Sequence, residues 1–208
     1  EININGGAGV DTLIVDLSNG LPFPLANINF DGETDGGYLV LESGSYAGSL
    51  TTVTHTLGSN SAGSISIDGQ FINYTGADAI ADNLVATNRV FDFLGAAETI
   101  TLSDSGTSND GLSSIDSTLG AAVTFISTTA VTVSTTSGSG ADLINIQGLD
   151  SLTAGNFTVT GDANDNATFQ TNNTEMGVND LTVTAQTITV DSAVSSTDGA
   201  ISLNMTGT

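Results

Sequence analysis

Short runs of alternating apolar and polar residues recur along the whole chain, and this pattern restricts the fold more than any other feature. A two-residue period rich in Val, Ile, Thr and Phe is typical of β-strands, and clusters of Gly, Asn, Asp or Ser between the runs are typical of turns. The sequence therefore predicts an all-β fold. The runs lie at residues 11–17, 38–43, 49–57, 64–69, 71–75, 89–95, 98–104, 122–128, 130–136, 142–148, 156–161, 167–172, 180–190 and 200–207.

Two architectures can produce such a series of strands. One is an antiparallel sandwich with hairpins, and the other is a solenoid whose coils each contribute short parallel strands. The second half favours the solenoid, because DLTVTA at 180–185 is matched 20 residues later by AISLNM at 200–205. We therefore expect an elongated parallel β-solenoid, similar to a β-helix, with a more sandwich-like N-terminal half.

The stretch GADAIADNLVATN, residues 76–88, has the composition of a helix. It predicts a short turn or helix that joins two regions. Residues 1–95 would form an N-terminal β region, and residues 96–208 would form the β-solenoid region. Because the sequence starts at Glu1 without Met and ends at Thr208 within a strand-like pattern, we expect a piece of a longer protein.

The charge balance excludes several classes of partner. The chain has 23 acidic residues and one basic residue, Arg89, so its net charge is -22. Nucleic acids and anionic membrane surfaces are bound through Lys and Arg, so neither is expected as a partner. No apolar run is long enough to predict membrane insertion. Without Cys or Lys, neither disulfides nor Lys–Asn crosslinks can form, and calcium is the expected cofactor.

Three glycine-rich stretches resemble half-sites for calcium. GGAGVDTLI at 6–14 fits the nonapeptide G-G-x-G-x-D-x-U-x, in which glycines turn carbonyl oxygens inward and Asp adds a carboxylate. SGSGADLIN at 137–145 departs only at its first residue, and TGDANDNAT at 160–168 is a looser copy. The alternative is that each is simply a turn before a strand. The candidate ligands are Gly7, Gly9 and Asp11; Gly138, Gly140 and Asp142; and Asp162, Asn164 and Asp165.

A fourth candidate calcium loop lies in FDGETDGGYLVLE, residues 30–42. Asp31, Glu33, Asp35 and Glu42 occupy positions 1, 3, 5 and 12 of the pattern D-x-[DN]-x-[DN]-G-x5-E, from which only Glu33 at position 3 departs. Alternate side chains would converge on one ion, and Glu42 would close the site. A strand pattern follows the loop and no amphipathic helix precedes it, so an acidic hairpin turn is the alternative.

Catalytic patterns are weaker. His55 is the only imidazole, and strand alternation places it on the same face as Val53 and Leu57, so we expect a packed or rim histidine and no enzyme. A carbohydrate-active β-helix is the main alternative, because two carboxylates can hydrolyse a glycoside. The T-x-T patterns in LTVTAQTITV and AVTVSTT raise a minor alternative, an ice-binding solenoid, although T-x-T does not recur at every coil.

The segments GGAGVDTLIVDL, GSGADLINIQGL and DLTVTAQTITVDSAVSSTDGAISLNMTG resemble β-strand repeats of giant bacterial cell-surface and adhesin-like proteins. GGAGVDTLI is similar to the haemolysin-type calcium repeat, and the last segment resembles coils of filamentous-haemagglutinin-type β-helices. The resemblance implies an extracellular, elongated module stabilised by calcium.

These observations lead to a structural hypothesis. The chain is expected to be a repeat module of an extracellular bacterial surface fibre or adhesin. It would associate end to end with neighbouring copies by strand addition or coil stacking, and glycans are a further expected class of partner.

Overall fold

The computed structural model describes residues 1–21, 27–46, 48–108, 110–126, 128–149 and 155–207. These residues form strands and turns and no helix, which confirms the predicted all-β fold. Accordingly, they contain no helix that could cross a membrane. In chain order the strands are β1 Ile2–Asn5, β2 Asp11–Asp16, β3 Ile28–Asp31, β4 Gly37–Glu42, β5 Leu50–Leu57, β6 Gly63–Ile67, β7 Gln70–Thr75, β8 Ala77–Asn83, β9 Ala86–Phe93, β10 Thr99–Asp104, β11 Leu112–Ser117, β12 Ala122–Ile126, β13 Ala130–Ser134, β14 Leu143–Ile146, β15 Asn156–Thr160, β16 Asn166–Phe169, β17 Thr174–Glu175, β18 Leu181–Ala185, β19 Thr187–Val190, β20 Val194–Ser195 and β21 Ile201–Met205.

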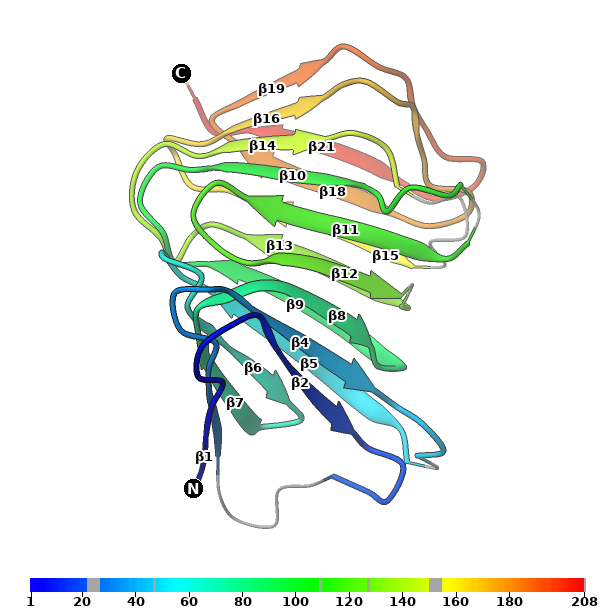
Figure 1. Cartoon of the computed structure of the whole chain (residues 1–208). Helices are drawn as coiled ribbons and strands as arrows, with labels where there is room; N and C mark the ends of the chain where they lie inside the picture. The colour runs from blue at the N-terminus through cyan, green and yellow to red at the C-terminus, as the bar shows by residue number, and fades with distance from the viewer. Residues whose placement is uncertain (22–26, 47, 109, 127, 150–154, 208) are drawn as a thin grey trace.

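Two large mixed sheets contain nearly all of these strands (Figure 1). Sheet A has ten strands in the order β1-β3-β7-β6-β5-β9-β13-β15-β18-β21. Sheet B has nine strands in the order β19-β16-β14-β10-β11-β12-β8-β4-β2, and β17 pairs with β20 in a small third sheet. Neighbouring strands are parallel except in β5-β6-β7 of sheet A and β10-β11-β12 of sheet B, which are antiparallel.

The C-terminal part of the chain passes repeatedly between the two sheets. β13, β15 and β18 lie in sheet A, and each is followed by a strand of sheet B, namely β14, β16 and β19. Leu181 of β18 pairs with Ile201 of β21 in parallel register, so the 20-residue repeat predicted from the sequence is confirmed as two neighbouring strands. In Figure 1 the first strands of the chain lie towards one end of the stack and the last strands towards the other.

The hydrophobic core lies between sheets A and B and follows the two-residue period of the strands. Leu39 and Leu41 of β4 are fully buried and face inward, whereas Tyr38 of the same strand is exposed. The core forms one cluster that includes residues from both halves of the chain. The boundary predicted near residue 95 falls within this continuous arrangement, because β9 pairs with both β5 and β13.

The prediction of a turn or helix at residues 76–88 is wrong. β8 occupies Ala77–Asn83 and pairs in parallel with β4 and β12, and β9 begins at Ala86. Ile80 and Asp82 face the core two residues apart, as a strand requires. Neighbouring strands provide hydrogen bonds along both edges of β8, and this pairing outweighs the helix propensity of its alanines.

Candidate functional site

Arg89, the only basic residue of the chain, is completely buried between the sheets. It lies on β9 in phase with Phe91 and Phe93, so the strand directs its side chain into the core. Its guanidinium holds Asp82 with two bonds, from Nε to Oδ2 at 2.8 Å and from Nη2 to Oδ1 at 3.0 Å. Such a forked pair is the strongest way to neutralise a buried carboxylate.

The same guanidinium also binds the backbone where two strands of sheet B end. Nη2 donates to the Leu84 carbonyl at 2.8 Å, just after β8, and Nη1 donates to the Ile126 carbonyl at 2.7 Å, at the end of β12. Along the chain, β8 of sheet B is followed directly by β9 of sheet A. Arg89 therefore joins β9 to the ends of two strands of the other sheet.

His55 completes this buried cluster. Its Nε2 lies 2.7 Å from Asp82 Oδ2, and because the carboxylate can only accept, Nε2 carries the proton. The imidazole stacks on Phe91 with ring centroids 5.1 Å apart, and Nδ1 has no hydrogen-bond partner. The prediction of a packed histidine is confirmed, since His55 has no exposed surface.

The electrostatic balance of the cluster favours an ionised Asp82. Burial alone would raise its pKa, but the Arg89 charge and the hydrogen bonds from His55 and Arg89 outweigh burial and lower the pKa to about 2. The cluster is closed to solvent, so it stabilises the fold and offers no surface for a substrate. The sequence did not predict that Arg89, Asp82 and His55 meet, although the alternation in residues 89–95 already places Arg89 on the same face as Phe91.

The predicted calcium motifs at residues 6–14 and 30–42 lie on neighbouring turns. Gly6 N–H donates to the Asp31 carbonyl at 2.8 Å, and Gly9 N–H donates to Asp35 Oδ2 at 3.0 Å. Asp11 follows the first of these turns, and its Oδ2 is buried without a hydrogen-bond partner among the described residues. The structure therefore brings Asp11 and Asp35, from separate sequence motifs, to the same end of the sheets.

Glycine is required in both turns, because Gly7 and Gly9 in the first turn have φ values of +83° and +105°, and Gly36 in the second has a φ of +88°. Glu33 also has a positive φ of 55° and is exposed, with its N–H donating to Asp31 Oδ1 at 3.0 Å. Glu42 is not brought to this loop. It ends β4, while Gly37 begins it, so about 16 Å of strand separates Glu42 from the turn.

The second and third nonapeptide copies also meet, but their carboxylates bind backbone amides. Asp142 and Asp165 precede β14 and β16, which are parallel neighbours. Glu98 N–H donates to Asp142 Oδ1 at 2.8 Å, and Asp142 N–H donates to Asp165 Oδ1 at 2.9 Å. Asp165 Oδ2 accepts from Asp162 N–H and from Thr135 Oγ1, both at 2.6 Å. Glu98, Asp142 and Asp165 thus form a buried column that links successive turns.

The remaining predicted ligands support these turns. Gly138 N–H donates to the Thr135 carbonyl at 3.0 Å, and Asn164 N–H donates to Asp162 Oδ1 at 2.6 Å. Gly140 has a φ of +120°, and a Cβ there would lie 2.5 Å from Ala97 N, so only glycine fits. Within the described ranges no three His, Cys, Asp or Glu side chains are grouped closely enough to hold a metal. Calcium binding therefore stays a prediction.

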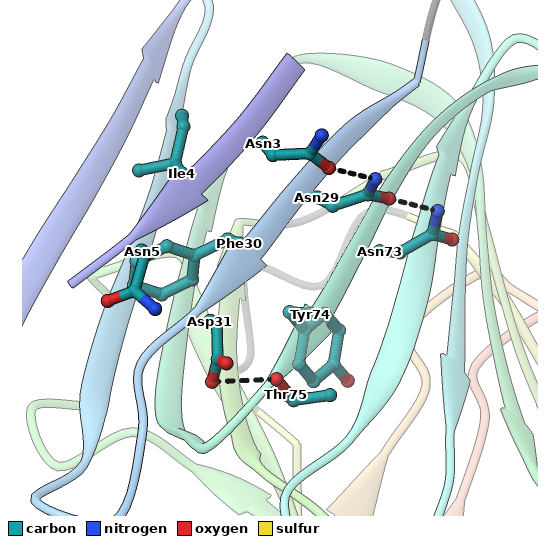
Figure 2. Close-up of a pocket in the computed structure, with 9 residues that line it drawn as sticks. All are labelled: Asn3, Ile4, Asn5, Asn29, Phe30, Asp31, Asn73, Tyr74 and Thr75. Carbon is teal, nitrogen blue, oxygen red and sulfur yellow. Dashed lines mark hydrogen bonds between the residues drawn. The ribbon is translucent and has the colours of Figure 1, made fainter. Parts of the chain in front are cut away.

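A hollow of about 470 Å³ lies over β1, β3 and β7 of sheet A (Figure 2). Asn3, Asn29 and Asn73 form a ladder of amides across it, joined by bonds of 2.7 and 2.8 Å. Phe30 and Tyr74 are 3% and 2% exposed, so neither ring is available for stacking on a sugar. Besides the amide ladder, Asp31 and Thr75, the apolar side chain of Ile4 lines the hollow, and glycan binding stays a prediction.

Comparison with known proteins adds no relatives. No protein family, curated protein or solved structure matches this chain.

We expect Arg89→Met to lower the free energy of unfolding by about 3–5 kcal/mol, because Asp82 would stay buried without its partner. Urea denaturation measures this loss. The double variant Asp82→Leu/Arg89→Met, which removes both charges, should recover part of it. A single variant as stable as the wild type would contradict this role for Arg89.

We expect stability to fall steeply as the pH drops from about 4 towards 2. The pKa of Asp82 is lowered from 3.8 to about 2 on folding, so its contribution is present above pH 3.8 and is lost as the group is protonated. Burial, which has the largest effect, raises the pKa of Glu98 and Asp142, as do neighbouring carboxylates, so protonation of these groups favours the folded state. Melting temperatures should therefore rise from pH 7 to pH 5 before they fall. Constant stability from pH 5 to pH 2 would contradict this assignment.

Proposed function

We propose that this chain is a structural module of an extracellular bacterial surface fibre or adhesin. Its strands would form a parallel β-solenoid that associates end to end with other copies, either in separate chains or along one longer chain. The parallel, in-register strands that alternate between sheets A and B support this architecture. The burial of His55, the only imidazole, supports a function without catalysis.

The observation that carries the proposal is the exposure of inward-facing apolar residues on β21. In the preceding strand, β18, the equivalent residues Leu181 and Val183 are fully buried. Their partners on β21, Ile201 and Leu203, are 40% and 38% exposed, and Met205 is 66% exposed. β21 pairs on one side only. A further strand on its open edge would bury these side chains and satisfy the backbone groups there.

β1 at the opposite edge of sheet A has the matching pattern. It also pairs on one side only, and Ile2 on it is 48% exposed. If β1 of another copy were added to β21 in parallel, Ile2 and Ile4 could align with Ile201 and Leu203. The outward residues of the two strands are then short and polar, as in the neighbouring pairs of sheet A.

Charge sets a condition for this association. Arg89 and His55 are both buried, so the chain exposes no basic side chain, and two copies would repel each other at low ionic strength. Divalent cations would reduce this repulsion. The turns that contain Asp11 and Asp35 are the best candidates for bound calcium, because Asp11 Oδ2 lacks a partner and carbonyl groups of the glycine turns lie nearby in sequence.

We expect Ile201→Asp/Leu203→Asp to abolish end-to-end association, because both charges would face the contact between copies. Light scattering and negative-stain microscopy across a range of protein and salt concentrations measure the association. Ser202→Asp/Asn204→Asp is the matched control, since it adds the same charge to outward positions of the same strand. Filaments that persist in the inward variant, or a wild type that is monomeric under every condition, would refute the proposal.

We also expect calcium to raise the melting temperature more than magnesium at equal ionic strength. Binding to the folded state alone stabilises it by about 2.7 kcal/mol when calcium is at 100 times its Kd. Asp11→Asn/Asp35→Asn should remove this difference, and Asp198→Asn is the control on an exposed turn away from these residues. Equal effects of the two ions on the wild type would remove calcium from the proposal.

A further inference from the structure

The outer face of sheet A carries two straight rows of hydroxyl side chains. The parallel register of β13, β15, β18 and β21 aligns outward residues that lie 26, 24 and 20 positions apart in the sequence. One row is Thr132, Thr158, Thr182 and Ser202, and the other is Ser134, Thr160, Thr184 and Asn204. The sequence lacks a regular T-x-T repeat because the intervals differ, yet the fold creates a regular array.

The threonines of this array, hereafter the Thr face, are free to bind. Thr132, Thr158, Thr160, Thr182 and Thr184 are half-buried, and their hydroxyls make no hydrogen bond to other described residues. Neither row contains a charged side chain. In the same strands the alternate residues, such as Phe157 and Val183, are buried in the core and hold the strands in place.

The spacing of the Thr face is set by backbone geometry. Neighbouring residues of one row lie on adjacent strands, about 4.8 Å apart, and the two rows are separated by two residues along each strand, about 6.7 Å. These two repeats, at right angles, are close to the oxygen spacings on a prism face of hexagonal ice. A threonine places a methyl group and a hydroxyl at each point of the array. The methyl group excludes water from its own position, and the hydroxyl can hydrogen-bond an ordered water molecule.

We propose that the Thr face binds ice. A crystalline ligand is favoured because the side chains repeat in two directions and offer no pocket. Ice is favoured over a crystalline glycan because no aromatic ring accompanies the rows for stacking on sugars. This function is distinct from end-to-end association, which uses the edge of sheet A and leaves its outer face open.

The array ends at β9, which limits the expected strength of binding. There Val90 and Asp92 occupy the two rows, although Thr54 and Thr56 continue them on β5. Four adjacent strands give a patch of about 14 Å by 7 Å. We therefore expect ice binding that is measurable as enrichment in ice, with little depression of the freezing point by a single module.

The test is the partition of the chain into slowly growing ice. The chain is labelled at its amino terminus, and the fraction in the ice is compared with that of an acidic reference protein that ice excludes. We expect the wild type to be enriched in the ice. The enrichment of Thr158→Arg/Thr182→Arg should be about tenfold lower, because its bulky charges disrupt adjacent strands of the array.

Thr101→Arg/Thr168→Arg is the matched control. It adds the same charge at half-buried, outward positions of sheet B and should partition like the wild type. Circular dichroism confirms that each variant is folded. Exclusion of the wild type from ice, or equal losses in both double variants, would overturn the proposal. Binding to cellulose or chitin particles that depends on Thr158 and Thr182, without enrichment in ice, would also overturn it and assign the face to a crystalline glycan.

Discussion

The ion pair between Arg89 and Asp82 is the interaction on which the arrangement of the two sheets depends. Each charge would be strongly unfavourable alone in a core of Phe, Ile and Leu side chains, and together they are neutral and joined by two hydrogen bonds. The guanidinium also satisfies the carbonyls of Leu84 and Ile126, where the backbone leaves two strands of sheet B. One side chain thus compensates a carboxylate and stabilises irregular backbone that no β-ladder could satisfy.

Burial of the only basic side chain gives the molecule an outer surface with negative charges only. Inside the turns, Asp142 and Asp165 accept backbone N–H groups, so hydrogen bonds satisfy these buried carboxyl oxygens. Apart from Asp82 and Glu98, the other acidic residues that the structure describes are exposed or half-buried, so ionic strength determines how closely two copies can approach. Charge and strand pairing therefore act together: the open edges favour association, and the surface makes it dependent on cations.

The sequence predicted those features that depend on local alternation. The two-residue period gave the all-β fold and the burial of His55, and the 20-residue repeat gave the pairing of β18 with β21. Features that depend on distant pairing were not predictable. Asp82 lies in an alanine-rich stretch that favours a helix until β4 and β12 pair with it. Likewise, Asp142 and Asp165 fit a calcium motif, and only the register of β14 and β16 shows that they bind neighbouring amides.

The two antiparallel triplets, β5-β6-β7 and β10-β11-β12, have a consequence for how such a chain can change in length. In a uniform repeat protein each unit contacts only its neighbours, so whole units can be gained or lost. In sheet A, β5 lies two strands beyond β7. The positions between β3 and β5 are occupied by β6 and β7, which come later in the chain than β5. Deletion of any one strand of these triplets would leave its two neighbours in the sheet without a pairing partner. Duplication of a whole turn is therefore compatible with the sheets from β1 to β4 and after β13, where each turn of the chain adds one strand to each sheet.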